Sequence, residues 1–395
     1  MNRAAWTATG LHGLVHALML IFPQVIVDLR RDLGCSLFEL SRAANIGYFA
    51  FGLGALPAGW LADRLGSRRV LVGCAAGLGV GAILVAAAEN LATLTFGMTV
   101  LGLSASVYHP AGLALLMRGV DGRGRRMGLH GVGGNLGEAV GPALAAATLA
   151  VGGWPLPYAV GALLAGLALG LVLRLPPDGP AMHPQAAGAV DRVSLALVLG
   201  IALCAGFAYR GVITFLPLYA RERFHAETTA SGSLLTSALL GAGVLSQWIG
   251  GRLADRAPRG GSERLFFAML LAPFVSLLAL VQVGGSVSFA LVAMLFGFFW
   301  FGAQPLQNAL PALYAPSARH GSLYGVIFFV SFGLGSVATS AGGWIAERRD
   351  VGSAFALFAA VVGVELILAG VLALRASRRG TGAAQAPGPD LLSPF

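Results

Sequence analysis

Long apolar runs constrain this chain more than any other feature of its sequence. Runs of about 20 residues recur throughout, separated by short breaks that carry arginine, glycine or proline, and an α-helix needs about 20 apolar residues to cross a membrane. Strands of a membrane barrel would be about half as long and would alternate in hydropathy. Charged residues make up only 11% of the chain, against about a quarter in a soluble domain. We therefore predict an all-α integral membrane protein with about twelve transmembrane helices, which begin near residues 6, 44, 70, 91, 127, 156, 193, 231, 265, 287, 320 and 352.

The arginines indicate which side of the membrane each loop faces. All 26 basic residues are arginine, and eighteen of them fall in the termini and the even-numbered loops, against seven in the remaining loops. Arginine-rich loops stay in the cytoplasm, so we predict a multi-pass protein of the cytoplasmic (inner) membrane with both termini cytoplasmic. The net charge of +9 is explained by this topology, and we predict no nucleic-acid partner.

Motifs for cofactors, metals and enzymatic chemistry are absent from the sequence. Cys35, Cys74 and Cys204 show neither a pairing pattern nor metal-ligand spacing. No phosphate-binding fingerprint of the P-loop kind occurs, and no nucleophile and base arrangement suggests an enzyme. We therefore expect no cofactor, no metal and no catalytic residue.

The sequence repeats itself at about half its length. "GWLADRLGSRR" after the second span has a shorter copy, "GRLADRAPR", after the eighth, and Asp63 and Asp255 are 192 positions apart. The fourth and tenth spans both contain a polar residue followed by proline, at His109 and Gln304, which are 195 positions apart. These offsets predict two structurally related halves.

The domain boundaries follow from composition. The longest connection between spans contains "PPDGPAMHPQAAGA", which has the composition of a flexible linker. The last residues, "RRGTGAAQAPGPDLLSPF", are similarly poor in large apolar side chains. We predict an N-terminal six-helix bundle at 1–174, a cytoplasmic linker at 175–192, a C-terminal six-helix bundle at 193–376 and a disordered cytoplasmic tail at 377–395.

A chain of six plus six spans with this loop motif after the second span resembles the major facilitator superfamily of secondary transporters. The resemblance implies that the loop latches the two halves together on the cytoplasmic side when the transporter faces outward. An ordinary basic loop that only sets topology is the alternative. The residues to which the latch role is carried over are Gly59, Asp63, Arg64, Gly66 and Arg68, and, from the degenerate second copy, Asp255 and Arg256.

Span five carries a stripe of glycines. Gly133, Gly137 and Gly141 recur every four residues, where another helix can approach closely, and Pro142 follows. The stretch "GGNLGEAVGPALAA" resembles the helix-five motif of proton-coupled exporters in the superfamily, which lies at the interface between the halves. Together with "YHPAG" it also resembles the fosmidomycin-resistance branch. A packing stripe with no bearing on transport direction is the alternative.

Ionisable groups inside spans are costly, so each is a functional candidate. Glu138 lies in the middle of span five, and we predict that it carries the coupled proton. His12 and His16 lie four residues apart on one face of span one, and histidine titrates near neutral pH, so with His109 they are further proton-coupling candidates. A structural carboxylate and histidines bonded to backbone are the alternatives.

Arg210 and the two proline interruptions predict where substrate binds. Arginine grips a carboxylate or phosphate through paired hydrogen bonds, and Arg210, preceded by Tyr209, lies in span seven. Arg210 is either a substrate anchor or the structural partner of Glu138. Proline breaks at matching positions of two halves indicate the binding site of a transporter. The predicted walls of that site are Tyr108 and His109 on one side, and Gln304 and Asn308 on the other.

These features favour secondary active export. We expect a proton-coupled antiporter, a monomer in the lipid bilayer, that moves a small organic compound or drug, an anion if Arg210 binds it, and so contributes to efflux and drug resistance. Uptake by proton symport is the first alternative. A membrane receptor that retains a transporter fold is the second.

Overall fold

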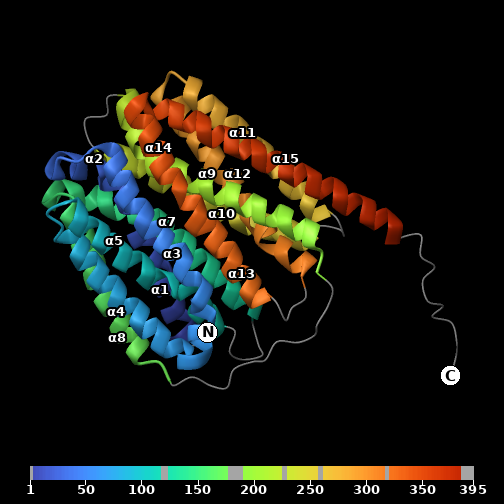
Figure 1. Ribbon diagram of the computed structural model, residues 1–395, viewed down its shortest axis with the longest axis horizontal. Coiled ribbons are helices and arrows are strands. Elements are labelled where there is room, and N and C mark those ends of the chain that lie inside the picture. Colours follow the sequence, from blue (N-terminus) through green and yellow to red (C-terminus); the bar gives the residue numbers. More distant parts are fainter. Residues whose placement is uncertain are drawn as a thin grey trace.

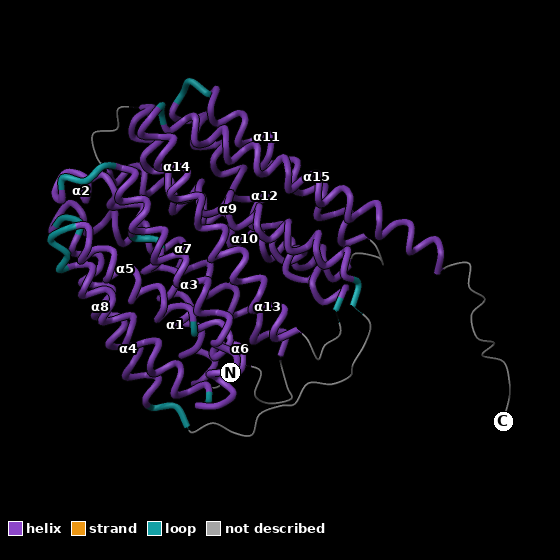
Figure 2. The backbone as a smooth tube through the Cα atoms, in the orientation of Figure 1, coloured by secondary structure: helices purple, strands orange, loops and turns teal. Residues whose placement is uncertain are grey.

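The computed structural model describes residues 3–116, 123–176, 190–224, 229–256, 261–315 and 320–383, and these residues are almost entirely helical (Figure 2). The first half of the chain contains α1 (Arg3–Met19), α2 (Phe22–Leu33), α3 (Leu37–Leu65), α4 (Ser67–Ala86), α5 (Leu91–Ser106), α6 (Tyr108–Leu116), α7 (Arg123–Gly152) and α8 (Pro155–Leu173). The second half contains α9 (Arg192–Phe224), α10 (Thr229–Arg256), α11 (Gly261–Gln282), α12 (Ser286–Tyr314), α13 (His320–Phe328), a π-helical turn, η2 (Phe329–Gly333), a 3₁₀ turn, η3 (Leu334–Ser336), α14 (Val337–Arg348) and α15 (Val351–Ala383).

The predicted all-α membrane fold with twelve spans is confirmed. Ten helical segments of the described chain are long and apolar enough to cross a membrane. Two further helices, α3 with 29 residues and α7 with 30, are equally long but carry more polar residues and glycine. Helices α1 with α2, α5 with α6, and α13 to α14 each form one interrupted span.

The two halves form separate bundles that meet along two seams (Figure 1). On one seam α3 packs against α13, η2, η3 and α14, and on the other α7 packs against α10. The predicted linker falls largely on residues 177–189, outside the described part of the chain. At its end, Asp191 contacts Arg375 of α15, with 3.4 Å between Arg375 Nη2 and Asp191 Oδ1. Helix α15 continues to Ala383, beyond the predicted start of the tail at residue 377.

The break between α1 and α2 follows from proline chemistry. Pro23 in the first turn of α2 has no N–H, so the carbonyl four residues earlier, that of Met19, loses its helical partner. The Tyr48 hydroxyl of α3 donates a hydrogen bond of 3.1 Å to this carbonyl. A carbonyl without a hydrogen-bond donor is costly inside a bilayer. The Tyr48 side chain of the next span therefore stabilises the break between α1 and α2.

Glycine allows three close helix contacts, one between the halves and two within them. A Cβ on Gly52 of α3 would lie 2.1 Å from the nitrogen of Gly333 in η2. Within the first half, a Cβ on Gly137 of α7 would lie 2.0 Å from the carbonyl oxygen of Gly13 in α1. The second half repeats this contact between Gly206 of α9 and the carbonyl oxygen of Ser331, at 2.1 Å. The repeated pair supports the relation between the two halves.

Replacing Gly137 with valine should separate α1 from α7. The new side chain would meet backbone atoms, which cannot move aside as a side chain can, so we expect a loss of roughly 1–3 kcal/mol or more. Thermal unfolding of the detergent-solubilised protein, followed by tryptophan fluorescence, measures the effect.

Gly131→Ala is the matched control, because the same helix leaves open space at that position. It should change the melting temperature little. Equal melting temperatures for Gly137→Val and Gly131→Ala would show that the α1–α7 contact is not tight.

Candidate functional site

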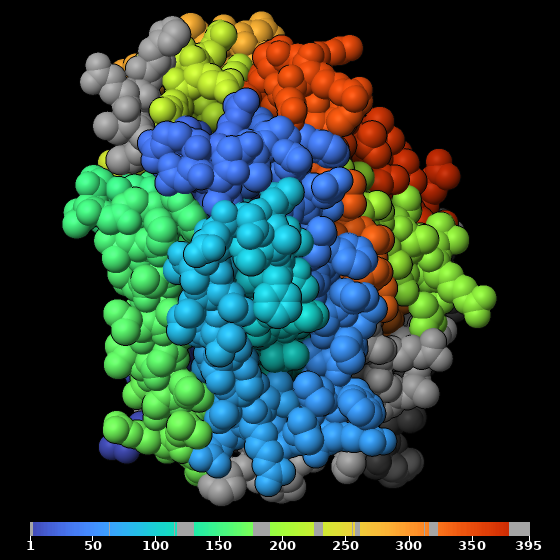
Figure 3. All heavy atoms as spheres, turned by 60° about the vertical axis from the view of Figure 1, so that its left-hand side comes forward, coloured from blue at the N-terminus to red at the C-terminus, as the bar shows by residue number. Residues whose placement is uncertain are grey.

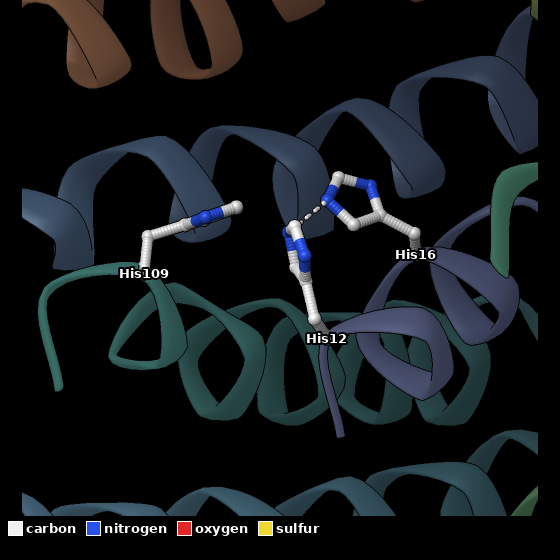
Figure 4. A group of neighbouring side chains, drawn as sticks. All are labelled: His12, His16 and His109. Atoms are coloured by element: carbon white, nitrogen blue, oxygen red, sulfur yellow. Dashed lines mark hydrogen bonds between the residues drawn. The ribbon is translucent and has the colours of Figure 1, made fainter. Parts of the chain in front are cut away.

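Four histidines and a glutamate form a connected polar cluster inside the first half. His12 and His16 come from α1, His109 from α6, and His130 and Glu138 from α7. The rings of His12 and His130 stack with centroids 3.9 Å apart. His12 Nε2 lies 3.1 Å from His16 Nε2, and His16 Nδ1 lies 3.3 Å from Glu138 Oε1. Figure 4 shows how the rings of His12, His16 and His109 converge.

The hydrogen-bond partners determine which ring nitrogens carry protons. His12 Nδ1 must be the donor to the backbone carbonyl of His130, at 2.8 Å, because a carbonyl only accepts. In neutral His12 the other nitrogen, Nε2, is then an acceptor, so His16 Nε2 donates to it. A favourable contact of His16 Nδ1 with Glu138 Oε1 then requires one proton between the two atoms, as imidazolium with carboxylate or as imidazole with carboxylic acid. Loss of that proton would leave two acceptors facing one another.

His109 connects the cluster to the second half. Its ring stacks on Phe328 of α13 with centroids 5.1 Å apart and lies near Phe332 of η2. Its centroid is 5.5 Å from that of His16. His109 is buried, and its Nε2 has no hydrogen-bond partner among the described residues.

Arg210 approaches the same region from the second half. It is 5% exposed, and its Cζ lies 3.8 Å from the centroid of the Tyr48 ring, a cation–π contact. Tyr209 is within electrostatic range of both Glu138 and Arg210. The described side chains include no ion pair between Arg210 and Glu138, whose carboxylate faces His16. Of the two predicted roles for Arg210, the structural partner of Glu138 is therefore not the one formed in this structure.

Four buried polar atoms around this point lack hydrogen-bond partners within the described part of the chain. They are His109 Nε2, Glu138 Oε2, Tyr209 Oη and Arg210 Nη1. Such atoms are rare in folded proteins because each loses its hydration without a replacement. His109 lies on α6, Glu138 on α7, and Tyr209 and Arg210 on α9, so both halves contribute buried polar atoms that are available to a polar ligand.

The histidines also have the spacing of metal ligands. His12, His16 and His109 place one ring nitrogen each within 4.8 Å of one another. The sequence showed no third ligand beside His12 and His16, and the fold supplies His109. Bridging by an ion would require the hydrogen bond between His12 Nε2 and His16 Nε2 to break.

A row of amides crosses from the first half to the second. Asn135 Nδ2 of α7 donates to Gln247 Oε1 of α10, and Gln247 Nε2 donates to Gln304 Oε1 of α12. Gln304 was predicted from its proline, whereas Gln247 was missed because an isolated glutamine gives no signal in the sequence. The predicted Asn308 side chain is exposed, and its backbone carbonyl accepts a hydrogen bond of 2.8 Å from the Tyr324 hydroxyl.

Tyr108 lies behind the histidines and does not face the second half. It is fully buried, its hydroxyl donates to the Ala8 carbonyl at 2.5 Å, and it lies 3.4 Å from His130 Nδ1. Its ring stacks on His12. Of the predicted wall of Tyr108 and His109, only His109 contacts aromatic rings of the second half.

The glycine stripe of α7 packs within the first half. Gly133, Gly137 and Gly141 face Thr9, Gly13 and Ala17 of α1. The resemblance implied that this motif lies at the interface between the halves, and α7 does pack against α10 of the second half, but these three glycines face α1. A different face of α7, which carries Asn135 and Ala139, points toward α10 of the second half. There the Ser237 hydroxyl donates a hydrogen bond to the Ala139 carbonyl. Pro142 lies inside α7 without ending it.

The described residues of the predicted latch contact their own half. Gly66 has φ of 83°, a backbone conformation that favours glycine, and it joins α3 to α4. Arg64 stacks on Trp60, with 4.5 Å from Cζ to the ring centroid. Arg68 Nη2 donates to the Leu173 carbonyl of α8 at 2.6 Å.

The other predicted latch positions show no contact between the two halves among the described residues. The Asp63 and Asp255 side chains lie outside the described part of the structure. Arg256 is exposed, and Gly59 has open space around its Cα. The latch remains a prediction.

Two related helical bundles around a buried polar site are the architecture of a membrane transporter. The chain belongs to the Major Facilitator Superfamily, whose family model matches residues 6–340. The proteins of this family are multi-pass membrane transporters of small molecules.

Three known proteins illustrate the relationship. The chain is 26% identical to a triacylglyceride transporter of Mycolicibacterium smegmatis over 82% of its own length but only 54% of that protein's length, so it spans about half of that relative. It is 28% identical to the 3-(3-hydroxy-phenyl)propionate transporter of Escherichia coli over 67% of each chain. A bacterial homologue of the human lysosomal transporter Spinster, solved in an inward-facing and unoccupied conformation, shares the fold over 98% of both chains, with a TM-score of 0.72 and 14% identity.

Tyr108→Phe should destabilise the histidine cluster. It removes the hydroxyl that bonds Ala8 and contacts His130, and the loss of a buried hydrogen bond costs about 1 kcal/mol. We expect the purified Tyr108→Phe variant to melt a few degrees below the wild type.

Tyr158→Phe is the matched control, because the Tyr158 hydroxyl is buried in α8 without a hydrogen-bond partner among the described residues. Its removal should be neutral or stabilising. If Tyr108→Phe melts at the same temperature as Tyr158→Phe, the Tyr108 hydroxyl does not hold the cluster.

Proposed function

We propose that the chain is a proton-coupled exporter that exchanges a small organic compound for protons by alternating access, with the face that carries both termini in the cytoplasm. The observation that carries the proposal is the contact of His16 Nδ1 with Glu138 Oε1 at 3.3 Å, beside buried polar atoms contributed by both halves. Acidic and histidine side chains inside spans are the usual proton carriers of transporters.

The geometry explains how a proton and a substrate exclude one another. Glu138 faces His16 through Oε1, and Tyr209 of the second half also lies close to the Glu138 side chain. A substrate that donates a hydrogen bond or carries a cation binds the carboxylate form of Glu138 best. Protonation of the pair then weakens substrate binding, and this mutual exclusion is what exchange requires.

Arg210 supports a second candidate function, uptake of an organic anion together with a proton. Loss of the shared proton makes the pair of His16 and Glu138 negative, which repels an anion bound at Arg210. An anion and a proton therefore favour each other's binding. The aromatic rings of Tyr48 and Tyr209 beside Arg210 suit an aromatic carboxylate, the chemical class named for the relative from Escherichia coli.

Glu138→Gln should abolish proton movement driven by substrate, because a side-chain amide does not bind and release a proton near neutral pH. The assay uses everted vesicles with an imposed pH gradient and a pH-sensitive dye, to which aromatic carboxylates, phosphonates and cationic drugs are added singly. The direction of substrate flux against the gradient separates export from uptake.

Glu365→Gln is the control for this experiment, since Glu365 is equally buried but lies in α15. It should retain the response of the wild type. A response that survives in Glu138→Gln would remove Glu138 from the proton path.

The Arg210→Lys variant distinguishes the effect of the positive charge at this position from the effect of the planar guanidinium group. Lysine keeps the positive charge but loses the planar fork that binds a carboxylate through two hydrogen bonds, so for an anionic substrate we expect KM to rise roughly 10- to 100-fold. Cationic substrates should be affected far less. An unchanged KM for every transported anion would show that Arg210 does not contact substrate.

A further inference from the structure

A groove of about 810 Å³ opens on the outer surface of the first half, away from the histidine cluster. Helices α7 and α8 form its walls and α1 forms its floor. Its lining includes Gly10 and Gly13 on the floor, and Leu136, Val140 and Leu167 on the walls. Because the lining is almost entirely apolar and the wall residues are exposed, the groove faces the hydrocarbon of the bilayer.

The groove forms because α7 and α8 pack mainly against different helices and only weakly against one another. Helix α8 lies mainly against α4, while α7 lies against α1 through its glycines. Gly10 leaves part of the space between them unfilled. A Cβ built on Gly10 meets no atom within 4 Å, so a larger residue there would enter the groove.

Two arginines close one end of this apolar groove. Arg3 begins α1, Arg174 follows the last residue of α8, and both line the groove and are exposed. Figure 3 shows the dark blue beginning of the chain beside the lower, green end of α8. This end lies on the face predicted to be cytoplasmic.

We infer that this groove binds an anionic phospholipid of the leaflet that it faces. An acyl chain lies between α7 and α8 on the glycines of α1, and the phosphate is held by the guanidinium groups of Arg3 and Arg174. Basic pockets at the cytoplasmic ends of transmembrane helices favour anionic headgroups. A zwitterionic lipid gains less, because its ammonium group is repelled by the same two arginines.

The position of the groove links this lipid to the transport site. Its floor, α1, also carries His12 and His16, and its wall, α7, carries Glu138. A lipid wedged against both helices therefore stabilises the arrangement in which His16 meets Glu138.

Native mass spectrometry of the full chain, released from nanodiscs of mixed phosphatidylglycerol and phosphatidylcholine, tests the inference. Wild type should retain phosphatidylglycerol in preference to phosphatidylcholine and should melt at a higher temperature when phosphatidylglycerol is present. The double variant Arg3→Gln with Arg174→Gln should bind phosphatidylglycerol roughly 10- to 30-fold more weakly. Gly10→Leu, which fills the groove without altering charge, should also lose retention.

Two variants serve as controls. Arg252→Gln removes an exposed arginine that stacks on Trp248 in the second half, and Gly166→Leu adds the same side chain to α8 outside the groove, where space is open. Both should retain the lipid as wild type does, and inorganic phosphate should not raise the melting temperature. Equal retention of the two lipids by wild type, or full retention by Gly10→Leu, would overturn the inference.

Discussion

Hydrocarbon offers no water to replace a lost hydrogen bond, and this constraint organises the site. Where Pro23 interrupts the first span, the carbonyl of Met19 is bonded by Tyr48, and the Tyr48 ring in turn carries Arg210. The position of a buried cation from the second half therefore depends on a proline in the first. The carbonyl of His130 similarly orients His12, which sets the proton pattern of the whole histidine cluster.

The fold was predictable because its signals are local. The number of spans follows from run length and hydropathy, and the two halves follow from repeated motifs, as with the matching loops around Asp63 and Asp255. The buried charges were predictable for a similar reason, since Glu138 and Arg210 stand out against apolar neighbours. None of these inferences requires knowledge of which helix faces which.

Partners were not predictable, because they depend on the rotation and tilt of packed helices. The sequence suggested Arg210 as the ion-pair partner of Glu138, whereas in the structure His16 lies beside the Glu138 carboxylate. The sequence offered His12, His16 and His109 as candidates, and the fold adds His130 of α7, whose ring stacks on that of His12. Gln247 has no distinguishing neighbour in its own span and acquires a role only when α7 and α12 lie on either side of it.

The contact of Gly52 with Gly333 has a mechanical consequence. Interlocked side chains must change rotamer before two helices can turn on one another, whereas bare backbones present smooth surfaces. Gly52 and Gly333 meet through their backbones, and the ring of Phe51 packs beside them on Phe332; Gly333 lies in a π-helical turn. At this one point of the α3 seam no side chain separates the two bundles, so a small rotation of one bundle against the other would require no rotamer change there.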